Sequence, residues 1–369
     1  MALGKVSVNN LNLGQGAVTE IERFFLFIGP ASKNIGKLLP LNTESDLDSE
    51  LGVAENDLKT QIIAARANGG DRWACVAAPI GPEGDWATAL ESAQDQGFSV
   101  EGVVITTPVT AGAELTAMHA AAEQLSGKYG RRVFVLAASA GILSTTPWAD
   151  YLAEQKEIVT GIAAPRVAIV PQLHGNDLGV LAGRLANAAW SIADSPMRVA
   201  SGPLIGLGQV PVDVDGKALP SAIRSELDKA RFSVSQTYPD YEGVYWGDAN
   251  LLDTPASDFQ VLENLRVVDK AARQIRPLLI RRIADRRLNN SAISMAVNKK
   301  ALMAPLRKMA KSVAFNGEVF PGEIEPPKDD SLVIAWKSRT QVEVYIKVRP
   351  LNCPKDITAN IALDLSEQE

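Results

Sequence analysis

Between residues 100 and 190 the chain alternates short, near-continuous apolar runs with longer amphipathic stretches. The apolar runs are rich in valine, isoleucine and alanine, which is typical of strands buried on both faces. Helices between such strands cover both sides of the sheet that the strands form. The pattern therefore predicts a parallel or mixed sheet built from strand 100–109, helix 113–130, strand 131–139, helix 148–163, strand 166–173 and helix 177–190.

The segment before residue 100 continues this pattern. The run at 24–28 is predicted to be a buried strand, because it is apolar throughout and is closed by Gly29-Pro30. Residues 57–80 predict a helix that stops at Gly69-Gly70 and a strand that follows. The chain is therefore predicted to be an α/β protein.

The C-terminal stretch contains two runs with a period of two. The first, 342–348, alternates valine or isoleucine with polar residues and predicts a half-buried strand. The second, 357–365, has the same period, but Pro350 and Pro354 prevent it from folding back as a simple hairpin. It therefore needs a partner strand from elsewhere. The apolar face of this second run consists of Ile357, Ala359, Ile361, Leu363 and Leu365.

The first 19 residues are polar and rich in glycine and asparagine. They show only weak alternation and can contribute little to a core of their own. We predict an extended arm here and not a helix. Its apolar residues are Val6, Val8, Leu11 and Leu13.

Charge is unevenly distributed. Residues 261–311 hold thirteen lysines or arginines and three acidic residues, a balance of +10, while the whole chain carries −6, so the remainder carries −16. Such segregation indicates a partner of opposite charge, either nucleic acid or another copy of the chain. Nucleic acid is the weaker alternative, because aromatic residues for base stacking are nearly absent between 261 and 314. The basic segment predicts a helix at 259–285, kinked or broken at Pro277, and a second helix at 298–313.

An α/β enzyme is a further alternative, and His174 is its best candidate residue. His174 follows a predicted strand in the sequence PQLHGND, and polar clusters at the carboxyl ends of strands are where α/β folds place active sites. The competing interpretation is a turn with a helix N-cap at Asp177. His119 lies in an alanine-rich helix, where packing or surface exposure is the expected role, and Cys75 and Cys353 are predicted to be reduced thiols.

The sequence shows no motif for a bound nucleotide or metal. It contains no GxxxxGK[ST] phosphate loop, no GxSxG nucleophile elbow and no CxxC pair. It also lacks a run of 18 apolar residues, so no membrane span is predicted. We therefore predict no catalytic residue, no cofactor and no metal.

The order of motifs resembles that of contractile tail sheath proteins of myophages and related contractile injection systems. FFLFIGPASKN at 24–34 is followed by a loop, a helix ending in Asn68-Gly69-Gly70 and a strand, as in sheath proteins. The stretch from Val244 to Leu279 is similar to the sheath pattern of a WGaR-type turn followed by a long arginine-bearing helix. Here the turn reads Trp246-Gly247-Asp248-Ala249 and lacks the arginine.

The resemblance implies an α+β inner domain with extended terminal arms and an outer α/β domain with a mostly parallel or mixed sheet. The terminal arms are expected to add strands to a neighbouring copy, which would provide the missing partner for the last strand. The expected division is an N-terminal arm at 1–19, the first part of the sheath core at 20–95, the outer domain at 96–235, the inner domain at 236–350 and a C-terminal arm at 351–369.

The resemblance also implies what the chain does and binds. It implies a structural, non-enzymatic subunit of a virion that polymerises around a tail tube, contracts, and is assembled in the cytoplasm of the bacterial host. The expected partners are further copies of the chain, the tube protein, and the baseplate and tail terminator proteins, without direct contact to nucleic acid or membrane. The arm residues expected between subunits are Val6, Val8, Leu11, Leu13, Ile357, Ile361 and Leu363. The expected intersubunit charge patch is Lys270, Arg273, Arg281, Arg282, Arg286 and Arg287.

Overall fold

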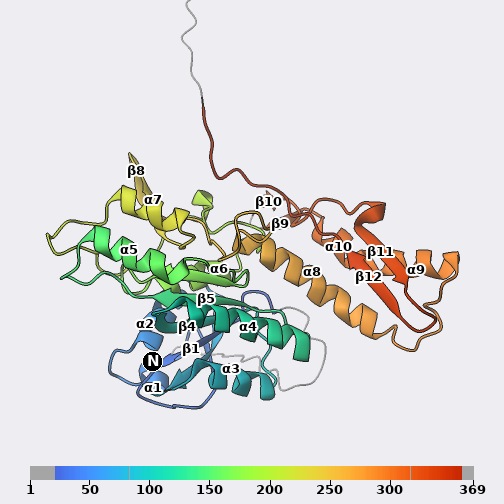
Figure 1. Cartoon of the computed structure of the whole chain (residues 1–369), viewed down its shortest axis with the longest axis horizontal. Coiled ribbons are helices and arrows are strands. Elements are labelled where there is room, and N and C mark those ends of the chain that lie inside the picture. The colour runs from blue at the N-terminus through green and yellow to red at the C-terminus, as the bar shows by residue number, and fades with distance from the viewer. Residues whose placement is uncertain (1–20, 83, 316, 360–369) are drawn as a thin grey trace, which may run out of the picture.

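The computed structural model describes residues 21–82, 84–315 and 317–359. A three-layer α/β body holds most of the chain, and one long helix, α8 (Leu262–Ile280), leads from it to a smaller C-terminal unit (Figure 1). The predicted α/β class is confirmed.

The central sheet has the strand order β2-β3-β1-β4-β5-β6. All neighbouring strands are parallel except β2, which runs antiparallel to β3 at one edge. The most apolar strands lie inside the sheet, because they need cover from helices on both faces. The bounds are β1 Phe25–Pro30, β2 Leu39–Asn42, β3 Ala74–Ile80, β4 Gly102–Val109, β5 Phe134–Ser139 and β6 Val167–Pro171.

Successive side chains of each strand enter two different cores. In β1, Phe25 and Phe27 face one helix layer, whereas Leu26 and Ile28 face the other. The first layer contains α2 (Asp57–Gly69) and α6 (Asp177–Ala186). The second contains α3 Trp86–Asp95, α4 Gly112–Tyr129 and α5 Trp148–Val159, with α7 Ser221–Lys229 packed beside α5; the short α1 is Leu47–Leu51.

Helices α2 and α6 approach each other closely at two glycines. A Cβ on Gly179 would lie 2.1 Å from the carbonyl oxygen of Gln61, and one on Gly183 would lie 2.3 Å from that of Ala65. Any larger residue at either position would push the helices apart. The two glycines, spaced by one helical turn, therefore set the short distance between α2 and α6.

The α/β body extends across two predicted domain boundaries. The boundary at 95/96 falls between α3 and β4, which contribute to the same hydrophobic core as β1. The boundary at 235/236 falls in the antiparallel pair β7 (Ser235–Tyr238) and β8 (Tyr241–Trp246). Trp246 and Leu251 pack in the same core as Phe25, so residues up to the start of α8 belong to the α/β body.

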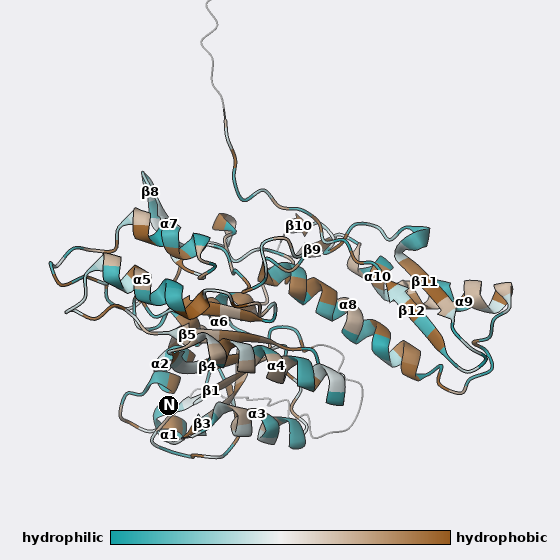
Figure 2. Cartoon of the chain, viewed as in Figure 1, coloured by the Kyte–Doolittle hydropathy of each residue, from teal (hydrophilic) through white to brown (hydrophobic). Residues whose placement is uncertain are grey.

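The C-terminal unit is built around the second half of α8. Its core joins Val267, Ala271 and Ile275 of that helix with Leu306 and Leu332 from later elements. Apolar and polar patches alternate along α8, as expected for a helix with a single buried stripe (Figure 2). The other elements of this unit are α9 Ala292–Leu302, α10 Ala304–Met309, the hairpins β9 Val313–Phe315 with β10 Glu318–Phe320 and β11 Leu332–Trp336 with β12 Val342–Ile346, and the 3₁₀ turn Asp329–Ser331. A second 3₁₀ turn, Val199–Ser201, lies between α6 and α7 in the α/β body.

The predicted helix boundaries in this region need correction. The first helix was expected to span 259–285 and to kink or break at Pro277, but α8 continues through Pro277 to Ile280. Pro277 cannot donate a hydrogen bond to the preceding turn, but only three helical residues follow it, so a distortion there affects little of the helix. The helix predicted at 298–313 is two helices, α9 and α10, which meet at Met303.

Candidate functional site

Helix α8 is fastened to the α/β body by buried ion pairs. Arg266 donates to both carboxylate oxygens of Glu101, at 2.7 and 2.8 Å, and to the carbonyl oxygen of Leu185 at 3.0 Å. Arg266 is 2% exposed and Glu101 1%. Near the next turn, Asp269 accepts a hydrogen bond from Arg166 at 2.7 Å. Separating the partners of such a pair would leave a buried charge unpaired, which is unfavourable. These contacts therefore fix the orientation in which α8 leaves the body.

The Arg266–Glu101 ion pair is expected to make the stability of the folded chain depend on pH. Burial acts to raise the pKa of Glu101, but the neighbouring Arg266 opposes it, and the net pKa lies below its ordinary value. A lowered folded-state pKa adds stability that is complete above the unfolded-state pKa of about 4.3. That stability is lost as the pH falls through the lower folded-state pKa. In urea unfolding, Glu101→Gln is therefore expected to be less stable than the wild type at pH 7. The difference should shrink at pH 3, and an equal difference at both pH values would contradict the assignment.

Two residues of the expected charge patch make ion pairs within their own chain. Lys270 lies 2.6 Å from Glu323, and Arg273 lies 3.0 Å from Glu22. The side chains of all four are at most 20% exposed. Arg273 therefore joins α8 to the α/β body, whereas Lys270 joins α8 to the chain that follows β10 in the C-terminal unit.

The other four predicted patch residues lie in the loop that follows α8. Arg281, Arg286 and Arg287 are exposed, whereas Arg282 is half-buried. Asp285 lies between Arg282, at 3.3 Å, and Arg287, at 2.8 Å. The outward charge of this loop is therefore carried by Arg281, Arg286 and Arg287.

Helix α9 presents its apolar face outward. Ile293 is 80% exposed and Val297 is 60% exposed, while Ser294 and Asn298 on the opposite face are buried. The Asn298 amide accepts a hydrogen bond from Arg282 at 2.6 Å and donates to the carbonyl oxygen of Arg287 at 2.9 Å. The polar face thus holds the basic loop in place, and the apolar face remains exposed beside it.

The β11–β12 hairpin has open edges. Among the described residues, the two strands pair only with each other in the sheet. A groove of about 720 Å³ lies between the end of β12 and the first turns of α8, and its apolar lining includes Phe259, Val268, Ile346 and Val348. An open strand edge exposes unpaired N–H and C=O groups, which another strand can satisfy.

The chain after β12 first follows its own subunit and then leaves it. The amide of Glu325 donates to the carbonyl oxygen of Arg349 at 2.8 Å, and the amide of Leu351 donates to that of Glu323 at 3.4 Å. The described end of the chain then points away from the molecule (Figure 1), and Ile357 is 78% exposed. The other predicted arm residues, Val6, Val8, Leu11, Leu13, Ile361 and Leu363, lie outside the described residues.

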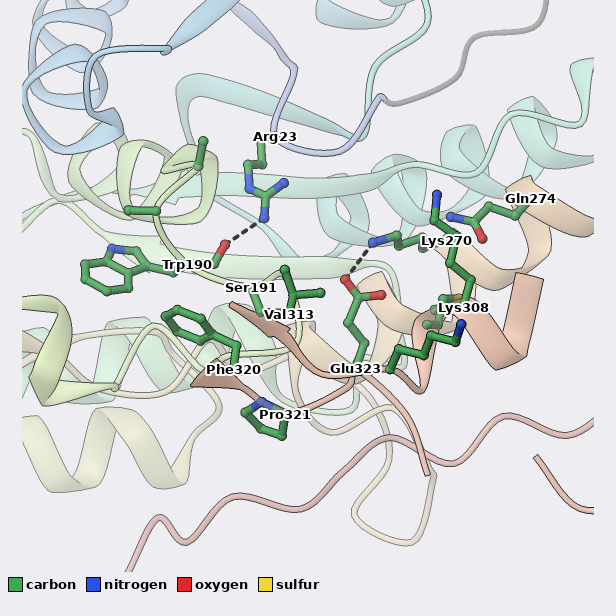
Figure 3. Close-up of a pocket in the computed structure, with 14 residues that line it drawn as sticks. Arg23, Trp190, Ser191, Lys270, Gln274, Lys308, Val313, Phe320, Pro321 and Glu323 are labelled. Atoms are coloured by element: carbon green, nitrogen blue, oxygen red, sulfur yellow. Dashed lines mark hydrogen bonds and ion pairs between the residues drawn. The ribbon is translucent and has the colours of Figure 1, made fainter. Parts of the chain in front are cut away.

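A pocket of about 250 Å³ separates the α/β body from the C-terminal unit (Figure 3). Arg23 donates across it to the carbonyl oxygen of Trp190 at 2.6 Å, and the Lys270–Glu323 ion pair lies on the opposite wall. The basic side chains of Lys308 and Lys311 also line it. Its charged lining consists of Arg23, Lys270, Lys308, Lys311 and a single carboxylate, Glu323, so the pocket has the character of a predominantly basic junction.

Comparison with known proteins identifies the family. Residues 3–250 match the family model described as DUF2586, N-terminal domain, and residues 258–366 match DUF2586, C-terminal domain. A protein of Haemophilus phage HP1 (strain HP1c1), whose name assigns it to the tail sheath proteins, is 44% identical over 368 residues, which cover 98% of each chain. The chain belongs to the tail sheath protein family.

Solved sheath structures share the fold over nearly the whole length. The sheath of the extracellular contractile injection system PVC, in its contracted state, superposes with a TM-score of 0.64 at 13% identity, covering 99% of this chain and 98% of the other. The contracted helical sheath of the anti-feeding prophage gives 0.60 at 14% identity, covering 98% and 99%. A sheath tail protein from Desulfitobacterium hafniense gives 0.54 at 11%, covering 95% and 96%. The predicted resemblance to tail sheath proteins is confirmed.

The histidine singled out as an enzymatic candidate has a structural contact in this sheath protein. Both carboxylate oxygens of Asp177 bind His174: one accepts its backbone N–H at 2.6 Å and the other lies 2.8 Å from its ring Nδ1. Asp177 is the first residue of α6, so the contact closes the turn before that helix. For His119, burial lowers the pKa of the ring.

No helix of the described chain is both long and apolar enough to cross a membrane.

Sequence reasoning missed two features of the sheath subunit. The exposed face of α9 could not be assigned, because Ile293 and Val297 have the same helical spacing as the buried Ser294 and Asn298. Periodicity shows that a helix has two faces but not which one is covered. The contact of Lys355 with Asp248 and Glu263 joins residues 92 or more positions apart. The turn Trp246-Gly247-Asp248-Ala249 stood out in the sequence for lacking the arginine of the WGaR pattern, but nothing in it pointed to Lys355.

Proposed function

We propose that the chain is the repeating subunit of a contractile tail sheath that polymerises as stacked rings around a tail tube. On a signal from the baseplate, the rings rotate and expand, and the shortening sheath drives the tube through the envelope of the target cell. The observation that carries this proposal is the C-terminal segment. In the described chain it makes no hydrogen bond or ion pair to its own subunit after Lys355, and Ile357 is 78% exposed.

Strand addition explains how such a segment links subunits. The run from Ile357 to Leu365 has the alternation of a half-buried strand, and the β11–β12 hairpin offers unpaired edges. Docked on a neighbour, the run would gain ladder hydrogen bonds and bury its apolar face. We propose the same role for the N-terminal arm with Val6, Val8, Leu11 and Leu13.

We propose that the free energy of contraction comes from contacts between subunits in the sheath lattice. Greater burial and better charge matching in the contracted state would supply the free energy, without nucleotide hydrolysis or a cofactor. Burying one leucine-sized side chain contributes about 1.5–3 kcal/mol. Because many subunits contract together, a few kcal/mol from each would be enough.

The exposed end of the C-terminal unit is proposed to meet an acidic surface of a neighbouring subunit or of the tube protein. Arg281, Arg286 and Arg287 supply its charge, and Ile293 and Val297 supply its apolar area. We further propose that the subunit contacts baseplate and tail terminator proteins, that it is part of the virion, and that it is assembled in the cytoplasm of the bacterial host.

Reversing two exposed charges tests this surface. Arg281→Glu combined with Arg286→Glu is expected to impair assembly or contraction while leaving the melting temperature nearly unchanged. Exposed pairs contribute under about 1 kcal/mol each and mainly set register. Arg282→Glu is the matched control, because Arg282 bonds Asn298 within the unit and its reversal should lower the melting temperature. Normal tubes from the double variant, seen by electron microscopy, would exclude this loop from the interface.

Negative-stain electron microscopy of the purified protein tests the proposed function as a whole. Tubes or stacked rings of one repeating subunit are expected as the protein concentration rises. A discrete monomer or dimer at every concentration, also when tube protein is added, would contradict the proposal.

A further inference from the structure

One lysine binds the C-terminal segment to the α/β body. The ammonium nitrogen of Lys355 lies 2.8 and 2.6 Å from the two carboxylate oxygens of Asp248 and 2.6 Å from Oε1 of Glu263. Asp248 belongs to the turn after β8, and Glu263 is the second residue of α8. A single side chain near the end of the chain therefore contacts the turn and the helix that connect the two parts of the subunit.

The two carboxylates need a cation. The Glu263 side chain is 6% exposed and that of Asp248 13%, and both bind the same nitrogen, so they lie close together. The Oε2 atom of Glu263 is buried without a hydrogen-bond partner among the described residues. Burial, followed by repulsion from Asp248, raises the pKa of Glu263 despite the opposing effect of Lys355. Without an ammonium group, this arrangement would hold two like charges in a poorly solvated site.

The sequence allows only one residue to fill this position. Lys355 is the only lysine or arginine between 350 and 369, and its neighbours are Pro354 and Asp356. A slip of one residue in either direction would place a proline or a carboxylate against Asp248 and Glu263. The next residue outward, Asp356, is repelled by the same charges, and Ile357 beyond it is exposed. The contact therefore defines a register as well as an attachment.

We propose that Asp248 and Glu263 form a socket for the ammonium group of Lys355. This socket anchors the C-terminal arm and fixes the residue at which the arm leaves its own subunit. The inference rests on the proposed function, in which the arm pairs with a neighbour. Residues up to 355 stay with the parent subunit and only the residues after it are exchanged. The socket thus sets the reach and direction of the link between subunits.

The natural cysteines allow a direct measurement of whether the segment around Lys355 is anchored to the subunit. Cys353 is exposed and Cys75 is buried, so a nitroxide spin label attaches to Cys353, two residues before Lys355. In the full-length protein before assembly, the label is expected to show slow motion. Lys355→Gln should shift its spectrum to fast motion, whereas Lys355→Arg, which keeps the charge, should stay slow. Lys347→Gln is the matched control, because Lys347 makes an exposed ion pair with Asp330 on the same segment.

Two further variants keep the test decisive if Lys355→Gln folds poorly. Asp248→Asn and Glu263→Gln each retain the shape of the socket but remove one charge, and each should also shift the label toward fast motion. Equal label motion in the wild type and all three charge-removing variants would overturn the claim that Asp248 and Glu263 anchor the arm through Lys355, whether or not tubes form. Faster motion with an unchanged rate of tube formation would overturn its role in setting the arm. Faster motion with slower tube formation supports both, while failure of the wild type to form tubes would contradict only the proposed function.

Discussion

Replacing Arg266 by alanine is expected to lower the free energy of unfolding by about 3–5 kcal/mol, the usual cost of removing one partner from a buried ion pair. The loss is large because Glu101, which is 1% exposed, keeps its charge and loses two hydrogen bonds. Arg266 also joins α8 to the body, so the orientation of the C-terminal unit should loosen with it. Urea unfolding followed by circular dichroism measures the change.

Arg276→Ala provides the matched control on the same helix. Arg276 is exposed, and truncating exposed side chains usually changes stability by no more than about 0.5 kcal/mol. If both substitutions had the same small effect, the Arg266–Glu101 pair would not hold α8 on the body. If both had a large effect, α8 would depend on its arginines in general and not on the buried pair.

The sequence predicted the layers of the body because its strong signals are local. The runs 131–139 and 166–173 each contain a nearly continuous apolar stretch, which favours a strand covered on both faces, and they contain β5 and β6. The helices between them follow from the same rhythm. The buried contact of His174 with Asp177 was also open to prediction, since it is a turn contact over three residues.

The sequence could not predict contacts that depend on the arrangement of distant segments. Nothing local to Phe25–Pro30 shows that this strand lies between β3 and β4, and this placement unites segments that were predicted to be separate domains. The same holds for the charge patch. Its composition was visible, but the pairing of Lys270 with Glu323 and of Arg273 with Glu22 depends on tertiary structure. A count of charges therefore overstated the cations available to a partner.

Removing residues 356–369 is expected to abolish tube formation while leaving the folded subunit intact. The described part of this segment makes no hydrogen bond to its own chain, and Ile357 is 78% exposed, so its loss should not change the melting temperature. A neighbouring subunit, however, would lose the whole added strand with its ladder bonds and apolar face. Negative-stain microscopy and thermal unfolding of the truncated chain measure the two effects separately.

A second truncation, after Pro350, distinguishes the exchanged arm from the segment that stays with its own subunit. It also removes Lys355 and leaves Asp248 and Glu263 without their cation, so this chain should melt at a lower temperature than the one cut after Lys355. Both chains should fail to form tubes, because both lack the strand. Normal tubes from the chain cut after Lys355 would show that the final 14 residues of the sequence are not the link between subunits. A large loss of stability in that same chain would instead mean that the segment packs on its own subunit.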